Sequence, residues 1–215
     1  YFEVTADGRP LRKRRYVFSE SFAAIAMAEY AKASGDMTYA EKALNLFKDI
    51  RRFIATPGCL EPKYLDTLQA KGHSIVMMML NVCQHMRKID DAPLYDEVIT
   101  DCIDRIINRF LKEDEKALFE TVGPNGERLN SPEGRLINPG HSMETAWFLM
   151  TEALHRKDDA LMKKAIQITL WSLERGWDWD KGGIFYFLDV ENKPVLLCIF
   201  GILPYYAEKS PKMFF

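Results

Sequence analysis

A histidine and a carboxylate stand three residues apart where a helix is expected to begin. Residues 135–144 read R-L-I-N-P-G-H-S-M-E, and the apolar residues that follow recur at helical spacing. Pro139 directs Asn138 away from helical dihedral angles, so His141 and Glu144 fall on one face of the first turn. Backbone N–H groups are unpaired there and the helix dipole is positive. An imidazole at this place tends to stay neutral near pH 7, which suits a general base.

Other polar residues occupy similar positions at expected helix starts. His73 follows a glycine where another helix begins, and Glu20 lies in the first turn of the helix near the N-terminus. For these residues, as for His141, capping of unpaired amides is the structural alternative to a role in a site. His85 and His155 lie late in their helices and are expected on the surface.

Several classes of site find no support in the sequence. H-x-x-E differs from the H-E-x-x-H pattern of zinc proteases, and glycine-rich nucleotide loops and the G-x-S-x-G elbow are absent. The four cysteines form no C-x-x-C pair, so neither a zinc site nor a disulfide framework is expected. We therefore predict no metal, reduced thiols and a cytoplasmic location.

Composition limits the partners of the chain. Its 215 residues carry a net charge of −2, with 47% hydrophobic and 28% charged residues, an ordinary globular balance. No basic field points to nucleic acid, and no run of about 18 apolar residues predicts a membrane span. The N-terminal segment resembles no signal peptide and lacks an initiator Met, so the chain is expected to start inside a longer protein.

Helices are expected to dominate the fold. Apolar residues three and four positions apart predict helices over residues 18–34, 37–55, 73–89, 93–110, 142–155 and 159–175. Short polar turns join these helices into three pairs. Turn signals between aromatic or β-branched runs predict β-hairpins over residues 1–11, 118–129 and 185–195. The pairs repeat at roughly 50–65 residues, which indicates a stacked α/α array, and the hairpins favour a closed ring with a pocket on one face.

Three stretches resemble the N-acylglucosamine 2-epimerase family, which includes the renin-binding proteins. The longest, residues 134–149, is similar to the family stretch G-R-x-x-N-P-G-H-x-x-E-x-x-W-F-L. Residues 10–26 resemble the segment after the family's first hairpin, and residues 179–186 resemble its G-G-x-x-Y stretch. The likeness extends from near Tyr1 to near Val195.

The resemblance implies an all-α fold, a partial (α/α)6 barrel of helical hairpins with short β-hairpin insertions. It also implies a sugar 2-epimerase that interconverts N-acetylglucosamine and N-acetylmannosamine by abstraction and return of the C2 proton. His141 would be one of two acid/base histidines, and the substrate-binding candidates are Glu144, Arg135, Glu20 and His73. The family needs no redox cofactor or metal, although nucleotides such as ATP activate several members.

The chain also departs from the family pattern. Three helical pairs make half of a six-pair ring, and the family's W-W-P-H-x-E-A and F-H-x-P-R stretches are absent after residue 195. We therefore expect a partial barrel domain over residues 1–195, a divergent tail over residues 196–215, and weak or no activity in the chain as given. A small sugar is the expected partner, with a homodimer as a further expectation.

Two other functions stay open at this point. The same scaffold could serve as a non-catalytic module that binds a sugar, a nucleotide or a protein. A glycoside hydrolase or lyase on an α/α toroid is the third interpretation. It would need two carboxylates flanking a glycosidic bond, and Glu144 has no evident partner for that role.

Overall fold

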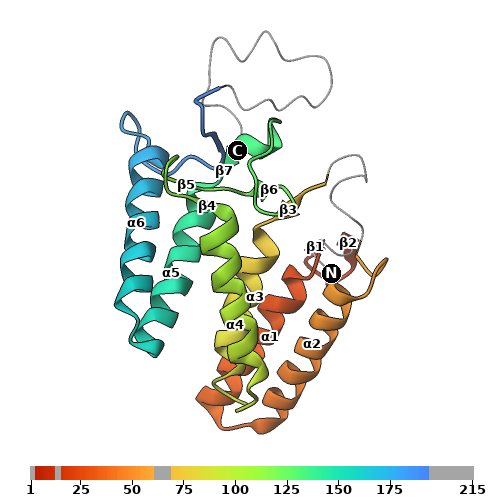
Figure 1. Cartoon of the computed structure of the whole chain (residues 1–215). Helices are drawn as coiled ribbons and strands as arrows, with labels where there is room; N and C mark the ends of the chain where they lie inside the picture. Colours follow the sequence, from red (N-terminus) through yellow and green to blue (C-terminus); the bar gives the residue numbers. More distant parts are fainter. Residues whose placement is uncertain (1–2, 13–15, 61–68, 194–215) are drawn as a thin grey trace. The chain divides into compact units, whose positions relative to one another are not determined.

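The computed structural model describes residues 3–12, 16–60 and 69–193 (Figure 1). The chain divides into two compact units, with the boundary between Asn108 and Arg109. The tail expected over residues 196–215 lies outside the described residues. Within the described part, no helix combines the length and apolar character needed to cross a lipid bilayer.

Helical hairpins build the first unit. Its helices are α1 (Phe18–Ser34), α2 (Met37–Ala55), α3 (Ser74–Met86) and α4 (Leu94–Arg105). A π-helical turn (Ile106–Phe110) continues α4 and contains the boundary between the two units. Helix α1 packs against α2 and α3, and α3 packs against α4. The short strands β1 (Glu3–Val4) and β2 (Pro10–Arg12) pair antiparallel, which confirms the first predicted hairpin, and β3 covers Lys71–Gly72.

Two sequence features explain how these helices pack. The buried face of α1 consists of small residues, which let neighbouring helices approach closely: Ser21, Ala24, Ala28 and Ala31. Helix α3 is apolar on nearly every side and is buried accordingly, from Val76 through Met77, Met78, Met79 and Leu80 to Met86. The prediction that this helix is buried is therefore confirmed.

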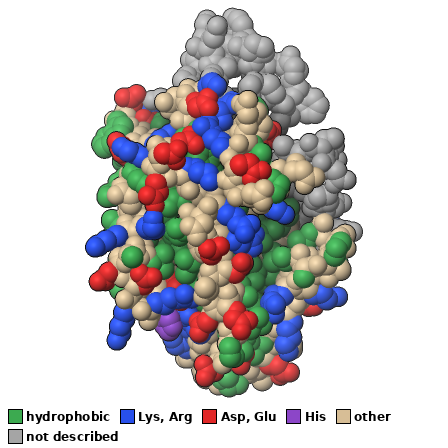
Figure 2. All heavy atoms as spheres, in the orientation of Figure 1, with side chains coloured by type: hydrophobic (Ala, Val, Ile, Leu, Met, Phe, Trp, Pro, Cys, Tyr) green, Lys and Arg blue, Asp and Glu red, His purple; other side chains and the backbone are tan. Residues whose placement is uncertain are grey.

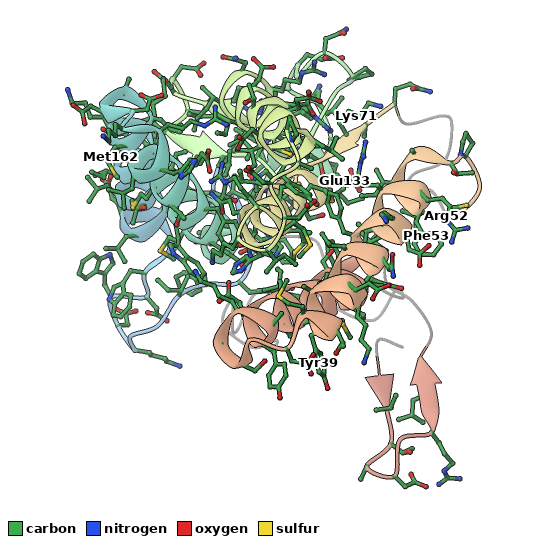
Figure 3. All side chains as sticks on the ribbon, turned by 90° about the horizontal axis from the view of Figure 1, so that it is seen from below. Tyr39, Arg52, Phe53, Lys71, Glu133 and Met162 are labelled. Carbon is green, nitrogen blue, oxygen red and sulfur yellow. The ribbon has the colours of Figure 1, made fainter. Side chains whose placement is uncertain are left out.

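The turn between α1 and α2 follows the rules for helix ends. Gly35 closes α1 with φ 77°, a left-handed conformation that glycine adopts without a steric penalty. Asp36 then caps α2 by accepting a hydrogen bond from the Thr38 amide at 3.0 Å. Outward-facing aromatic residues of α2 appear in Figure 3, where Arg52 lies over the ring of Phe53 at 5.0 Å from its centroid.

The second unit is a helical hairpin with short strands at one end. Its helices are α5 (Pro139–Arg156) and α6 (Asp159–Gly176), which pack against each other. The other elements are β4 (Leu111–Lys112), β5 (Ala117–Leu118), β6 (Thr121–Val122), a 3-10 turn (Glu133–Arg135), β7 (Leu136–Ile137) and β8 (Leu188–Asp189). Strand β4 pairs antiparallel with β5, and β7 pairs antiparallel with β8. Figure 1 shows β4, β5 and β7 at the end of the hairpin where α5 begins.

The second predicted hairpin was wrong about strand pairing, and part of the third lies outside the described residues. Leu118 pairs with Leu111 rather than with residues 128–129, although the predicted turn itself forms, with the Gly123 amide donating to the Glu127 carbonyl at 2.7 Å. Leu188 pairs with Ile137, about 50 residues earlier in the chain, and residues 194–195 of that predicted hairpin lie outside the described part. Turn signals are local, whereas strand pairing depends on distant contacts.

Charges of both signs are mixed over the face seen in Figure 2, where Lys and Arg side chains alternate with Asp and Glu. Several pairs are close enough to be ion pairs, such as Arg52 with Asp49 at 2.9 Å. Among the described residues on this face, basic and acidic side chains therefore lie side by side.

Candidate functional site

The start of α5 fixes the position of His141. Asn138 has extended backbone angles and caps the helix, with its Oδ1 accepting a hydrogen bond from the His141 amide at 3.0 Å. Pro139 occupies the first helical position, where its missing N–H has no cost. The helix begins at Pro139 rather than at residue 142 as predicted, so His141 lies inside the first turn. The cap at Asn138 holds the backbone amide of His141 in place.

A largely buried carboxylate contacts the imidazole of His141. Glu120 Oε1 lies 3.0 Å from His141 Nδ1. The side chain of Glu120 is 11% exposed and that of His141 is 31% exposed. The carboxylate therefore lies on the protein side of the ring, and the imidazole is the more accessible member of the pair.

The backbone around Glu120 is anchored to β7. The Glu120 amide donates to the Leu136 carbonyl at 3.2 Å, and Phe119 forms an isolated β-bridge with Ile137. Phe119 is also buried, with its amide bonded to the Phe110 carbonyl at 3.0 Å. Strand β7 leads directly into the α5 cap, so the same strand positions both the carboxylate and the histidine.

Glu144 follows one turn after His141 and is half-buried. Thr145 lies beside it, and its hydroxyl donates to the His141 carbonyl at 2.7 Å. Helical spacing of three residues places Glu144 and His141 on neighbouring positions of the α5 surface. In this arrangement the imidazole can exchange a proton, and the nearby carboxylate can accept hydrogen bonds from a hydroxylated ligand.

Arg135 is engaged in a buried ion pair. Its Nε donates to Asp189 Oδ2 at 2.8 Å, and the two side chains are 14% and 3% exposed. The Val190 amide also donates to the Arg135 carbonyl at 2.9 Å. Burial by itself would raise the pKa of Asp189, but the hydrogen bond from Arg135 holds that pKa below its ordinary value. In this geometry Arg135 ties β8 to the segment that precedes α5.

The far end of α6 closes tightly on the start of α5. A Cβ atom on Gly176 would lie 2.5 Å from Pro139 Cβ, so only glycine fits there without movement. Next to it, Arg175 donates to the Val190 carbonyl at 2.9 Å and to the Glu115 carbonyl at 3.0 Å. These contacts fix the helix start that carries His141.

The remaining predicted site residues belong to the first unit. Glu20 lies in the first turn of α1 and is half-buried, and His73 precedes α3 and is 1% exposed. The His73 carbonyl accepts a hydrogen bond from the Met77 amide at 3.1 Å, as expected at a helix start. His85, predicted on the surface, is instead half-buried, with Nδ1 2.7 Å from Glu29 Oε1. His155 is exposed as expected.

Comparison with known proteins gives the family of the chain. The model of the family N-acylglucosamine 2-epimerase (GlcNAc 2-epimerase) matches residues 1–197. The chain belongs to the N-acylglucosamine 2-epimerase family. It is 33% identical over 196 residues to the N-acylglucosamine 2-epimerases of Rattus norvegicus and Homo sapiens. The match covers 89% of this chain and 46% of each relative, so the chain spans about half the length of these relatives.

Solved structures give the fold of this epimerase-family chain. A cellobiose 2-epimerase from Bacillus thermoamylovorans matches with a TM-score of 0.69 and 16% identity, over 85% of this chain and 50% of that one. A sugar epimerase from a ruminal bacterium matches with a TM-score of 0.66 and 17% identity, over 87% and 51%. The fold class is therefore the predicted one, part of an (α/α)6 barrel built from helical hairpins.

Sequence reasoning missed Glu120. It lies 21 positions before His141, outside the family stretch at residues 134–149, and no local spacing links the two. The available signal was chemical, because a histidine base usually has a carboxylate or carbonyl partner on its second nitrogen. Several acidic residues between positions 113 and 133 could have met that requirement, and only the pairing of residues 119–120 with β7 selects one of them.

Proposed function

We propose that this chain carries a sugar 2-epimerase site in which His141 exchanges the C2 proton of an N-acetylhexosamine. The observation that carries the proposal is the geometry of the α5 start, where a partly exposed imidazole has a largely buried carboxylate at 3.0 Å. Membership of the N-acylglucosamine 2-epimerase family supports the choice of substrate class.

The proposed chemistry needs a base and no electron transfer. In the ring-opened sugar, the C1 aldehyde acidifies the hydrogen on C2. His141 accepts that proton, and the electron pair of the broken C–H bond is delocalised over C2, C1 and O1 as an enolate. Return of a proton to the opposite face of C2 inverts that centre, and return to the same face restores it. The side chains act by proton transfer alone, so we propose that neither metal nor redox cofactor takes part.

Other residues have supporting roles in this proposal. Glu144, one turn from His141, accepts hydrogen bonds from sugar hydroxyls. Glu20 and His73 remain proposed substrate contacts from the first unit. The Arg135–Asp189 ion pair, at 2.8 Å, stabilises the strand pair before α5. Arg135 therefore supports the site through the backbone, and a direct contact between Arg135 and sugar is the less favoured role.

The experiment follows deuterium at C2 and the formation of the other epimer. N-acetylmannosamine is incubated with the chain in D2O, and NMR records the C2 proton and the signals of both epimers. Because weak activity is expected of the chain as given, the proposal predicts slow uptake of deuterium at C2, with deuterated N-acetylglucosamine as a minor product. Binding of the sugar with an intact C2–H bond over the full incubation would contradict the proposal and favour a non-catalytic binding module.

A further inference from the structure

The Glu120–His141 contact has a defined direction. Glu120 Oε1 lies 3.0 Å from Nδ1 of the ring, so the other nitrogen, Nε2, is on the far side of the imidazole. An ionised carboxylate can only accept hydrogen bonds. A neutral His141 that keeps this contact must therefore carry its proton on Nδ1, which leaves the lone pair on Nε2.

Burial gives this arrangement a second consequence. The carboxylate is 11% exposed against 31% for the imidazole, so water solvates it less than it solvates the ring. A negative charge in that position stabilises the imidazolium that forms when the ring accepts a proton. The same carboxylate thus selects the neutral tautomer and favours the protonated product of the transfer.

Both members of the pair are held by one backbone segment. Glu120 is bonded through its amide to Leu136 in β7, at 3.2 Å. His141 is bonded through its amide to Asn138, at 3.0 Å, immediately after β7. The separation of the two side chains is therefore set by six consecutive residues, 136–141, and by the pairing of residues 119–120 with the strand. A contact fixed at both backbones is pre-organised rather than induced by a ligand.

We propose that Glu120 is a positioning residue that holds His141 as the Nδ1–H tautomer, so that Nε2 is the atom that receives the C2 proton. The inference rests on the proposed function only for the identity of that proton. The part that concerns the tautomer stands on the geometry alone. Glu120 acts through His141 and does not itself contact the reacting atoms.

The tautomer can be measured without a substrate. Long-range ¹H–¹⁵N NMR distinguishes protonated from unprotonated ring nitrogens, and the chain has four histidines, so His141→Gln assigns the signal. We expect the Nδ1–H form of His141 in the wild-type chain at neutral pH. Glu120→Gln and Glu120→Ala should shift His141 toward the Nε2–H form, whereas Glu174→Gln, an exposed carboxylate on α6, should leave it unchanged.

The kinetic measurement uses the same variants. Loss of the positioning carboxylate is expected to lower the rate of C2 deuterium exchange by about 10²- to 10⁴-fold, the range for a misplaced acid/base group. Glu120→Asp, which keeps the charge on a shorter side chain, should recover part of the loss and also serves if the Gln variant does not fold. Far-ultraviolet circular dichroism checks the fold of each variant.

The outcomes separate the two proposals. An Nε2–H tautomer in the wild-type chain, or an unchanged His141 signal in folded Glu120→Gln, overturns the positioning role. Exchange that depends on His141 but not on Glu120 also overturns it, while the proposed function stands. A tautomer that responds to Glu120 in a chain without any sugar exchange supports the positioning role and contradicts the proposed function.

Discussion

The Arg135–Asp189 ion pair allows a perturbation whose size follows from the structure. The substitution Arg135→Gln leaves the Asp189 carboxylate, 3% exposed, without its cation. Removing one member of a buried ion pair costs about 3–5 kcal/mol, because the other charge stays buried. The Arg135 side chain is 14% exposed, so some water reaches the pair and we take about 3 kcal/mol, the lower end of that range.

The pH dependence of this loss has a definite sign. In the wild-type chain the pKa of Asp189 is below its ordinary value, although burial opposes the hydrogen bond from Arg135. The stabilisation is therefore complete above the ordinary pKa of about 4 and is lost as the pH falls further. In Arg135→Gln burial is no longer opposed by a cation, so the carboxyl is expected to protonate at a higher pH. The difference in free energy of unfolding should shrink on acidification.

Urea denaturation at about pH 7 and about pH 4 measures the difference, and hydrogen exchange of the Val190 amide reports on the β7–β8 region. The control is Arg105→Gln, which removes an exposed pair with Asp101 at 3.4 Å and should cost less than about 0.5 kcal/mol. A loss in Arg135→Gln below about 1 kcal/mol, or one that is equal at both pH values, would refute the assigned role of the pair.

Three further predictions concern packing, capping and titration. Asn138→Ala should lower the free energy of unfolding by about 1 kcal/mol through loss of the α5 cap, whereas Asn138→Asp should keep most of the capping stabilisation. Equal losses for the two variants in urea denaturation would rule out the cap. Gly176→Ala should lower the free energy of unfolding by about 1–3 kcal/mol, because the added Cβ meets Pro139. Gly72→Ala is the control, since a Cβ there has open space. Similar melting temperatures for the two variants would disprove the close contact. Burial lowers the pKa of His85 despite its hydrogen bond to Glu29, so the free energy of unfolding should fall below about pH 6.5 by at most about 1.4 kcal/mol per pH unit. His85→Gln should flatten that slope, and an unchanged slope would contradict the burial effect.

The helices could be predicted from the sequence because their signal is local. Side chains three and four positions apart share a face, so α1 and α2 match the predicted bounds and α6 differs by one residue. The same argument failed at α5, where Pro139 belongs to the helix as its first residue. Strand pairing was harder, because β7 and β8 are two residues long and far apart in sequence. Such short strands carry almost no periodic pattern.

In the candidate site, too, local relations could be predicted from the sequence and distant contacts could not. His141 and Glu144 share a helical turn, so their relation follows from spacing, as does the cap at Asn138. The partners of His141 and Arg135 do not follow from spacing. Glu120 and Asp189 come from segments 21 and 54 positions away, which only the pairing with β7 brings near. The sequence thus pointed to His141, the proposed base, but not to the carboxylate beside it.

The rate of C2 deuterium exchange in His141→Ala, measured against His155→Ala, tests the central claim most directly. Both histidines belong to α5, and His155 is exposed near the other end of that helix. N-acetylmannosamine in D2O should lose its C2 proton at the same rate with the wild-type chain and with His155→Ala. It should lose that proton only at the uncatalysed rate with His141→Ala. Equal exchange with His141→Ala and the wild-type chain would contradict the account, since another group would then be the base.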